Sequence, residues 1–270
     1  MSSPIGNREV ENIRNSDYSE DQNEEMIDKL IRYAAVGFTV GAMNNAARYD
    51  VEVGGRRSNF VTVYDRNVTN SRGEAEWFAR YDAPHSHFPH HHINMNRAIT
   101  GFPDPHIRIS ETTARVARRT GQALDAVNTA APYLTAATVA HEAYQINNSL
   151  EKDLRNQSSR NTVKNAATTT AATVGAYTAS RVGASIGTAI LPGIGTMIGG
   201  LIGGVLGGIG GGIGSENAYE AILHGVLRGT VILDTFNYDI DYIVCRKCNK
   251  QFQHRRYQHG HTQKICSNCR

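Results

Sequence analysis

The stretch GTMIGGLIGGVLGGIGGGIG, residues 195–214, constrains the fold of this chain more than any other. It contains eleven glycines and eight aliphatic or methionine residues. Each glycine destabilises a solvated helix by about 1 kcal/mol relative to alanine. Such a run is therefore either a flexible linker or a helix whose backbone contacts another backbone closely.

The glycines of this run recur every four residues and form two ladders. On a helix, four-residue spacing places each ladder on one continuous face. Small residues at this spacing let two helices approach closely, as in membrane helix pairs, whereas a flexible linker is rich in Gly and Ser and has no apolar face. The pattern therefore favours a packed helix. The first ladder is Gly195, Gly199, Gly203, Gly207 and Gly211, and the second is Gly200, Gly204, Gly208 and Gly212.

A second ladder-bearing segment precedes the run and predicts a helical hairpin. Its small residues are Gly175, Ala179, Gly183 and Gly187, and the chain turns at Leu191-Pro192-Gly193. A twenty-residue helix extends about 30 Å, the thickness of a hydrocarbon core, so the hairpin is a candidate for membrane insertion. Arg181 opposes this, because a central arginine costs at least about 2.5 kcal/mol to insert. A soluble helical pair with buried glycine faces is the alternative.

The segment ATVGAYTASRVGASIGTAILPGIGTMIGGLIGGVLGGIGGGIG resembles the glycine-zipper segments of membrane-associated and toxin-like proteins. The preceding PHHHIN and TGFPDPHIRIS resemble segments placed before such zippers in large secreted bacterial proteins. The zipper resemblance implies close helix packing over residues 172–214, and the small-residue ladders themselves favour self-association. It implies no catalytic residue.

All four cysteines lie near the C-terminus, at Cys245, Cys248, Cys266 and Cys269. Two CxxC pairs at this separation are typical of a four-thiolate zinc site, and the alternating segment FNYDIDYIV predicts the strand that leads into it. The segment resembles a four-Cys zinc ribbon. With four protein ligands the coordination sphere is full, so the expected Zn²⁺ is structural.

The loop between the cysteine pairs is basic and contains aromatic residues. Such a surface is typical of contact with nucleic acid, but it also fits anionic lipid or an acidic partner protein. If the hairpin is inserted, this basic flank predicts a C-terminus that faces the cytosol. The candidate contact residues are Lys250, Arg255, Arg256, Tyr257 and Lys264.

A histidine-rich and proline-rich segment covers residues 82–106. Its prolines exclude a long helix and predict extended and turn structure. Two imidazoles on one face of an extended segment can bind a metal ion or transfer a proton, and the candidate ligands are His85, His87, His90 and His92. A connecting segment that packs on the following helix is the simpler interpretation, and hydrolytic chemistry is a third.

The remaining segments predict a mainly α-helical protein with small β elements. We expect a disordered N-terminus over residues 1–24, an α+β region over 25–108, a helical region over 109–229 that contains the hairpin, and a zinc ribbon over 230–270. A hairpin is expected around Gly54-Gly55, and a helix is expected to begin at the N-cap Ser110. Pro132 predicts the start of a second helix, and a short helix is expected after Ser215.

The sequence contains no HExxH, P-loop or Rossmann motif, which favours a non-enzymatic protein. The N-terminus has no basic segment followed by an apolar core, so we expect an intracellular rather than a secreted protein. The preferred hypothesis is an oligomeric, membrane-associated and membrane-perturbing zipper hairpin with a zinc-ribbon interaction module. The alternatives are a soluble cytosolic or nuclear zinc-ribbon protein that binds nucleic acid, and a toxin-like effector whose histidine segment hydrolyses a substrate.

Overall fold

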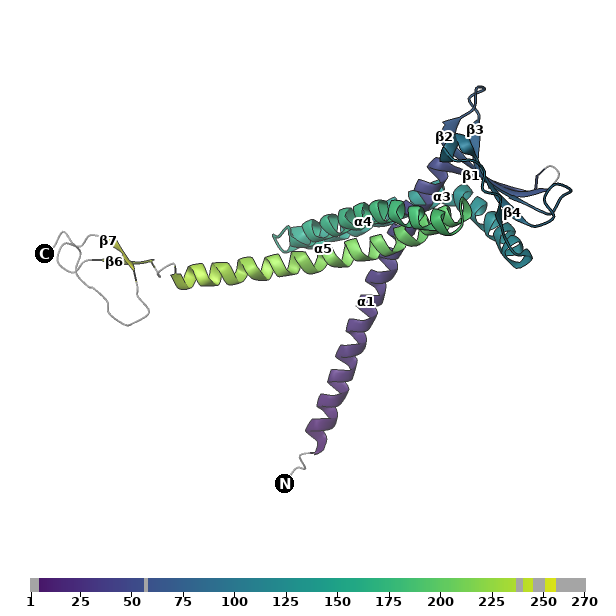
Figure 1. Cartoon of the computed structure of the whole chain (residues 1–270). Helices are drawn as coiled ribbons and strands as arrows, with labels where there is room; N and C mark the ends of the chain where they lie inside the picture. Colours follow the sequence, from purple (N-terminus) through teal and green to yellow (C-terminus); the bar gives the residue numbers. More distant parts are fainter. Residues whose placement is uncertain (1–4, 56–57, 237–239, 245–250, 256–270) are drawn as a thin grey trace. The chain divides into compact units, whose positions relative to one another are not determined.

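The computed structural model of this chain describes residues 5–55, 58–236, 240–244 and 251–255 (Figure 1). The chain forms two compact units, Met1–Glu216 and Asn217–Arg270. The first unit combines long helices with an antiparallel sheet and contains the glycine zipper. The expected class, mainly α with small β elements, is confirmed.

Helix α1 spans Ile5–Arg48 and begins within the segment that was expected to be disordered. Residues 5–24, which we expected to be disordered, form its first turns. The expectation relied on the lack of apolar periodicity, but this segment contains no proline after Pro4, the residue that most strongly disfavours a helix interior. Its second half carries buried apolar side chains, among them Tyr33 and Val36.

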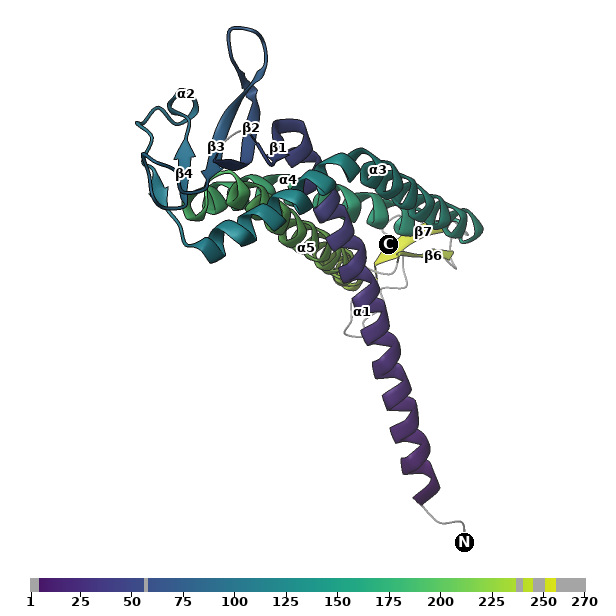
Figure 2. The same ribbon diagram turned by 90° about the vertical axis from the view of Figure 1, so that its right-hand side faces the viewer.

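Five antiparallel strands follow in a meander whose spatial order is the chain order (Figure 2). The expected hairpin joins the first two strands, and Gly54 adopts a left-handed φ of 83° there, a conformation that glycine accepts without steric strain. The strands are β1 (Tyr49–Val53), β2 (Asn59–Thr69), β3 (Ala75–Asp82), β4 (His92–Met95) and β5 (Ile107–Arg108). The histidine-rich segment is extended or turned except for the short helix α2 (Arg97–Thr100).

Helix α3 spans Glu111–Arg155, and the side chain of Ser110 caps it by accepting a hydrogen bond from the Thr113 backbone N–H. The cap was expected, but the predicted break at Pro132 was wrong. A proline inside a helix costs about 3 kcal/mol because it removes a hydrogen bond and crowds the preceding turn. Packing on both sides of that point outweighs the cost, since Leu124 and Ala131 before it and Glu142 after it are buried.

Helices α4 (Arg160–Ile190) and α5 (Ile194–Phe236) form the expected hairpin and lie side by side over the glycine run (Figure 1). The chain reverses at Leu191-Pro192-Gly193, and Gly193 adopts a left-handed φ of 82°. The separate helix expected after Ser215 is instead the continuation of α5. Its glycines therefore do not interrupt the helix.

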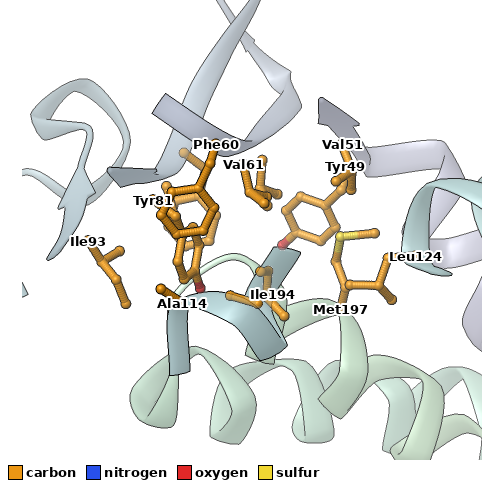
Figure 3. Close-up of a cluster of buried hydrophobic side chains, with 14 residues drawn as sticks. Tyr49, Val51, Phe60, Val61, Tyr81, Ile93, Ala114, Leu124, Ile194 and Met197 are labelled. Carbon is orange, nitrogen blue, oxygen red and sulfur yellow. The ribbon is translucent and has the colours of Figure 1, made fainter. Parts of the chain in front are cut away.

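The apolar core of the first unit lies between one face of the sheet and the helices (Figure 3). Tyr81 points from the sheet toward the helices, and Tyr81, Ile93 and Ile194 of this cluster are almost fully buried. The Tyr81 hydroxyl donates a hydrogen bond of 2.6 Å to the Pro192 carbonyl oxygen. Burial raises the pKa of this phenol. The hairpin turn is therefore anchored in the sheet.

The C-terminal unit contains an antiparallel pair of strands, β6 (Ile240–Val244) and β7 (Gln251–Arg255). Strand β6 lies within the segment expected to lead into the first cysteine pair. The four cysteines lie outside the described residues. The same holds for Lys250, Arg256, Tyr257 and Lys264 among the candidate contact residues.

Candidate functional site

The first glycine ladder of α5 faces α4 and forms a seam in which the two backbones touch. A methyl group added at any of these glycines would lie closer than 3.0 Å to backbone atoms of α4. Only residues without large side chains fit such a contact, as the sequence analysis predicted. The facing pairs are Gly195 with Gly187, Gly199 with Gly183, Gly203 with Ala179, Gly207 with Gly175, and Gly211 with Ala171.

The second ladder faces α1, a partner that the sequence analysis missed. A methyl group on Gly204 would lie 2.5 Å from the Gly37 carbonyl oxygen, and one on Gly208 would lie 2.5 Å from the Tyr33 carbonyl oxygen. Gly41 lies against Gly200 and Leu201 in the same way. The four-residue spacing of Gly37 and Gly41 was the signal in the sequence. Both ladders of α5 are thus occupied within one chain.

A buried polar network ties α1, α3 and α4 together beside this seam. The Arg32 guanidinium lies 2.5 Å from a carboxylate oxygen of Glu142, and it also donates hydrogen bonds to Asn165 and Thr169. Burial opposes ionisation of Glu142, but the hydrogen bonds from Arg32 and Thr169 outweigh it and lower the pKa of Glu142. The network fixes the three helices at one relative position.

A second ionic cluster lies further along α5. The carboxylate of Glu216 is 2.9 Å from Lys29 of α1 and 2.9 Å from Lys164 of α4. Its side chain is only 12% exposed. Separating the hairpin from α1 would therefore break a buried ion pair as well as the glycine contacts.

An open apolar groove of about 860 Å³ runs along the α4–α5 seam and is lined by residues within the range 175–206 of these two helices and the turn between them. Seam glycines form part of its lining, and none of the described residues that line it is charged. Thr178 supplies its one polar side chain. Of the large apolar side chains that line it, five are more than half exposed to solvent. These groove residues are Val182, Ile186 and Ile190 on α4, and Ile202 and Leu206 on α5.

Arg181 does not line this groove. Its guanidinium carbon lies 4.6 Å from the centre of the Tyr177 ring, and both residues border a different pocket together with Arg48. The charge that opposed membrane insertion in the sequence analysis is therefore separate from the apolar surface. Within the described part of the chain, the helix segment Ile194–Leu223 is long and apolar enough to cross a membrane.

The structure brings two of the four candidate histidine ligands together, along with an aspartate. Asp82 and His92 are directly opposite each other in the register of β3 and β4. His85 lies in the turn that follows β3, where its backbone exchanges two hydrogen bonds with Phe88. The candidate ligand atoms of Asp82, His85 and His92 all lie within 4.8 Å of one another.

The other two histidines lie outside this group. His87 is exposed, with its ring centre 6.3 Å from that of His85. The His90 ring packs against Phe88, while its backbone carbonyl oxygen accepts a hydrogen bond from Nδ1 of His92. The segment thus contains a local cluster rather than a row of four equivalent imidazoles.

Two family models match separate parts of the chain. Residues 32–127 match the C13G5.2-like N-terminal domain, and residues 155–214 match the C13G5.2-like glycine zipper domain. The chain is also 35% identical over 148 residues to the protein from Caenorhabditis elegans named "Uncharacterized protein C13G5.2". This match covers 55% of the present chain and 42% of the relative. No solved structure matches the chain.

The matched regions agree with the contacts described above. The first region contains the C-terminal part of α1, the five-stranded sheet and the start of α3, while the second contains α4 and the glycine run of α5. The contact of Gly37 with Gly204 joins the two matched regions. Residues 155–214 therefore form a glycine-zipper domain that is similar to the one named after the C. elegans protein.

Proposed function

We propose that this chain is a non-enzymatic protein that associates with membranes through the apolar groove of the α4–α5 hairpin. The uncharged surface carries this proposal, because exposed apolar patches of this kind mark membrane or protein interaction sites. The exposed fractions of the five groove side chains together equal about three whole side chains. Burying them contributes roughly 5–9 kcal/mol before the cost of immobilising the protein, since a whole Val, Ile or Leu side chain contributes about 1.5–3 kcal/mol. That is enough for measurable partition into lipid.

Lipid acyl chains fit this groove better than a protein partner does. A specific protein interface carries about one hydrogen bond per 100–200 Å², whereas Thr178 is the one polar side chain among the residues that line the groove. The α5 residues that line the groove lie within the apolar helix segment Ile194–Leu223. Acyl chains require no hydrogen-bonding groups from their partner.

The contacts favour a hairpin that lies in the plane of the interface over one that spans the bilayer. From Gly175 to Ile190 the groove extends about 22 Å along α4, which is shorter than the roughly 30 Å hydrocarbon core. Spanning would also separate Tyr81 from Pro192 and Lys29 from Glu216. Amphipathic helices at interfaces bury only their apolar face. Insertion across the bilayer, with a cytosolic C-terminus, stays a prediction.

Vesicle flotation of the full-length protein tests the proposal. Val182→Glu places a charge in the groove, and Val139→Glu places the same charge on α3. The two valines are 56% and 62% exposed, so both variants are expected to fold. We expect wild type and Val139→Glu to float with vesicles and Val182→Glu to remain at the bottom. Equal flotation of the two variants, or no flotation of the wild type, contradicts the proposal.

We also propose that the cysteine quartet binds one structural Zn²⁺ and serves as an interaction module. The pairing of β6 with β7 supports this, since Val244 is opposite Gln251 and the six residues between them include the first CxxC pair. Zinc analysis of the purified chain tests it. The joint change Cys245→Ser and Cys248→Ser should remove one equivalent of zinc, and an unchanged zinc content would refute the assignment.

Contact of this module with nucleic acid or an acidic protein stays a prediction, as does self-association of the chain. Both zipper ladders are occupied within one chain, so an oligomer requires a surface other than the two ladders. Hydrolysis by the histidine-rich segment also stays a prediction.

A further inference from the structure

We propose that Asp82, His85 and His92 form a binding site for a divalent transition-metal ion, with zinc as the best fit. The site lies at the end of β3 and β4, in the sheet region of the first unit. It is separate from the cysteine quartet and from the apolar groove, so this inference does not depend on the proposed membrane association.

The orientation of His92 is what a metal ligand requires. Its side chain is 1% exposed, and its Nδ1 donates a hydrogen bond of 2.9 Å to the His90 carbonyl oxygen. Because a carbonyl oxygen can only accept, Nδ1 carries the proton, and the lone pair of the neutral ring lies on Nε2. Histidines that bind metals almost always donate their other ring N–H in this way. Nε2 lies 3.9 Å from Asp82 Oδ2.

Asp82 is held in place and keeps capacity for an ion. Arg80 donates hydrogen bonds to both carboxylate oxygens, at 3.2 Å to Oδ1 and 3.1 Å to Oδ2, and Asn94 donates one of 2.8 Å to Oδ2. A carboxylate offers about four lone-pair positions. Three of these positions accept the hydrogen bonds from Arg80 and Asn94, so one lone-pair position on Oδ1 remains for an ion. Arg80 and Asn94 then orient a ligating carboxylate, as partners in the outer layer of metal sites do.

The spacing of the three ligand atoms lies within reach of a tetrahedral ion. Bonds of about 2.1 Å place two ligands of a tetrahedral zinc ion about 3.4 Å apart. The observed separations are at most 4.8 Å, so two ligand atoms must approach each other by at most about 1.4 Å. His85 can supply this movement, because its side chain is only partly buried while its backbone is fixed by the two hydrogen bonds to Phe88.

The surroundings complete a compact site with one position left for a further ligand. The Phe88 ring centre lies 4.4 Å from that of His92, and the His106 ring stacks on His92 at 5.7 Å. His106 has a left-handed φ of 45°, a conformation that costs energy in residues other than glycine. Two imidazoles and a carboxylate are a donor set of zinc sites that keep an open position for water.

Zinc titration of a full-length chain without the cysteine ligands tests this site. The chain carries Cys245→Ser, Cys248→Ser, Cys266→Ser and Cys269→Ser, is stripped with EDTA and is titrated with Zn²⁺ against a chromophoric chelator. We expect one zinc ion per chain and a higher unfolding midpoint when zinc is bound. His85→Ala should weaken zinc binding by more than about tenfold.

His87→Ala is the matched control, because it removes an imidazole from the same turn but from outside the ligand group. It should bind zinc like its parent chain. If the cysteine-free chain does not fold, zinc analysis of the chain with intact cysteines replaces the titration, and His85→Ala should contain one zinc ion fewer than His87→Ala. Equal zinc binding by these two variants, or no zinc bound by the foldable cysteine-free chain, overturns the proposal.

Discussion

Alanine substitution at two glycines of α5 separates the steric function of the seam from helix propensity. Gly199 faces Gly183, and a methyl group there would meet the backbone of α4 at less than 3.0 Å. Gly210 lies on the same helix, and a methyl group there would have no heavy atom within 4 Å. The two variants share the same chemical change and differ only in their surroundings.

The two variants are expected to differ in their free energy of unfolding. Alanine gains about 1 kcal/mol over glycine inside a helix, so Gly210→Ala should stabilise the protein by about that amount. Gly199→Ala gains the same amount but must push two backbones apart, and overpacking of this kind costs about 1–3 kcal/mol. Gly199→Ala should therefore be less stable than Gly210→Ala by about 1–3 kcal/mol, because the propensity terms cancel.

Denaturant unfolding followed by circular dichroism in lipid-free buffer measures this difference. Comparing midpoints is enough, since a chain of two compact units need not unfold in one step. If Gly199→Ala proves as stable as Gly210→Ala, the two backbones do not touch at the seam. The glycines of α5 would then not be required for close packing against α4.

Three further predictions follow from the packing of α1 and the helix ends. Gly37→Ala should destabilise the protein although Gly37 is distant from the glycine run in the sequence, because the added methyl group would meet the Gly204 carbonyl oxygen. Unfolding midpoints measure this effect, and a stabilised variant would contradict it. Arg32→Ala should cost about 3 kcal/mol because it leaves the Glu142 carboxylate buried and unpaired, and an unchanged midpoint would argue against the network. Burial opposes ionisation of Asp153, but hydrogen bonds from Thr162 and Asn161 lower the pKa of Asp153 to about 2. Stability from this carboxylate is present above about pH 4 and is lost as the pH falls toward 2, so Asp153→Asn should show a weaker acid dependence of unfolding than wild type.

The hairpin could be predicted from the sequence because its signal is local and repeated. Four-residue spacing specifies one helix face, and Pro192-Gly193 specifies the turn. The second partner of α5 could not be predicted with the same certainty, because Gly37 and Gly41 are only two glycines in a helix with ordinary apolar periodicity. Which helix lies on the second ladder depends on contacts between residues more than 150 positions apart.

Other errors arose where tertiary packing outweighs local preference. A proline usually ends a helix, but the free-energy cost of Pro132 is smaller than the stabilisation from the packing that keeps α3 continuous. For the histidine cluster, the sequence indicated which residue types could bind a metal ion, but the strand register determines which of these residues lie close together. Asp82 and His92 face each other across two strands, whereas His87 points elsewhere in the same short turn. A pattern of histidines alone does not contain that information.

The seam and the apolar groove should also depend on each other, which gives a last prediction. Seam glycines such as Gly183 and Gly199 line the groove, so close approach of α4 and α5 is what places Ile186 and Ile202 along one surface. The methyl group of Gly199→Ala would enter this lining and push the helices apart. We therefore expect Gly199→Ala to float with vesicles several-fold less than Gly210→Ala, at a temperature where both remain folded. If Gly199→Ala is destabilised but floats as well as Gly210→Ala, membrane binding does not depend on the seam, and the lipid-binding surface lies elsewhere on the chain.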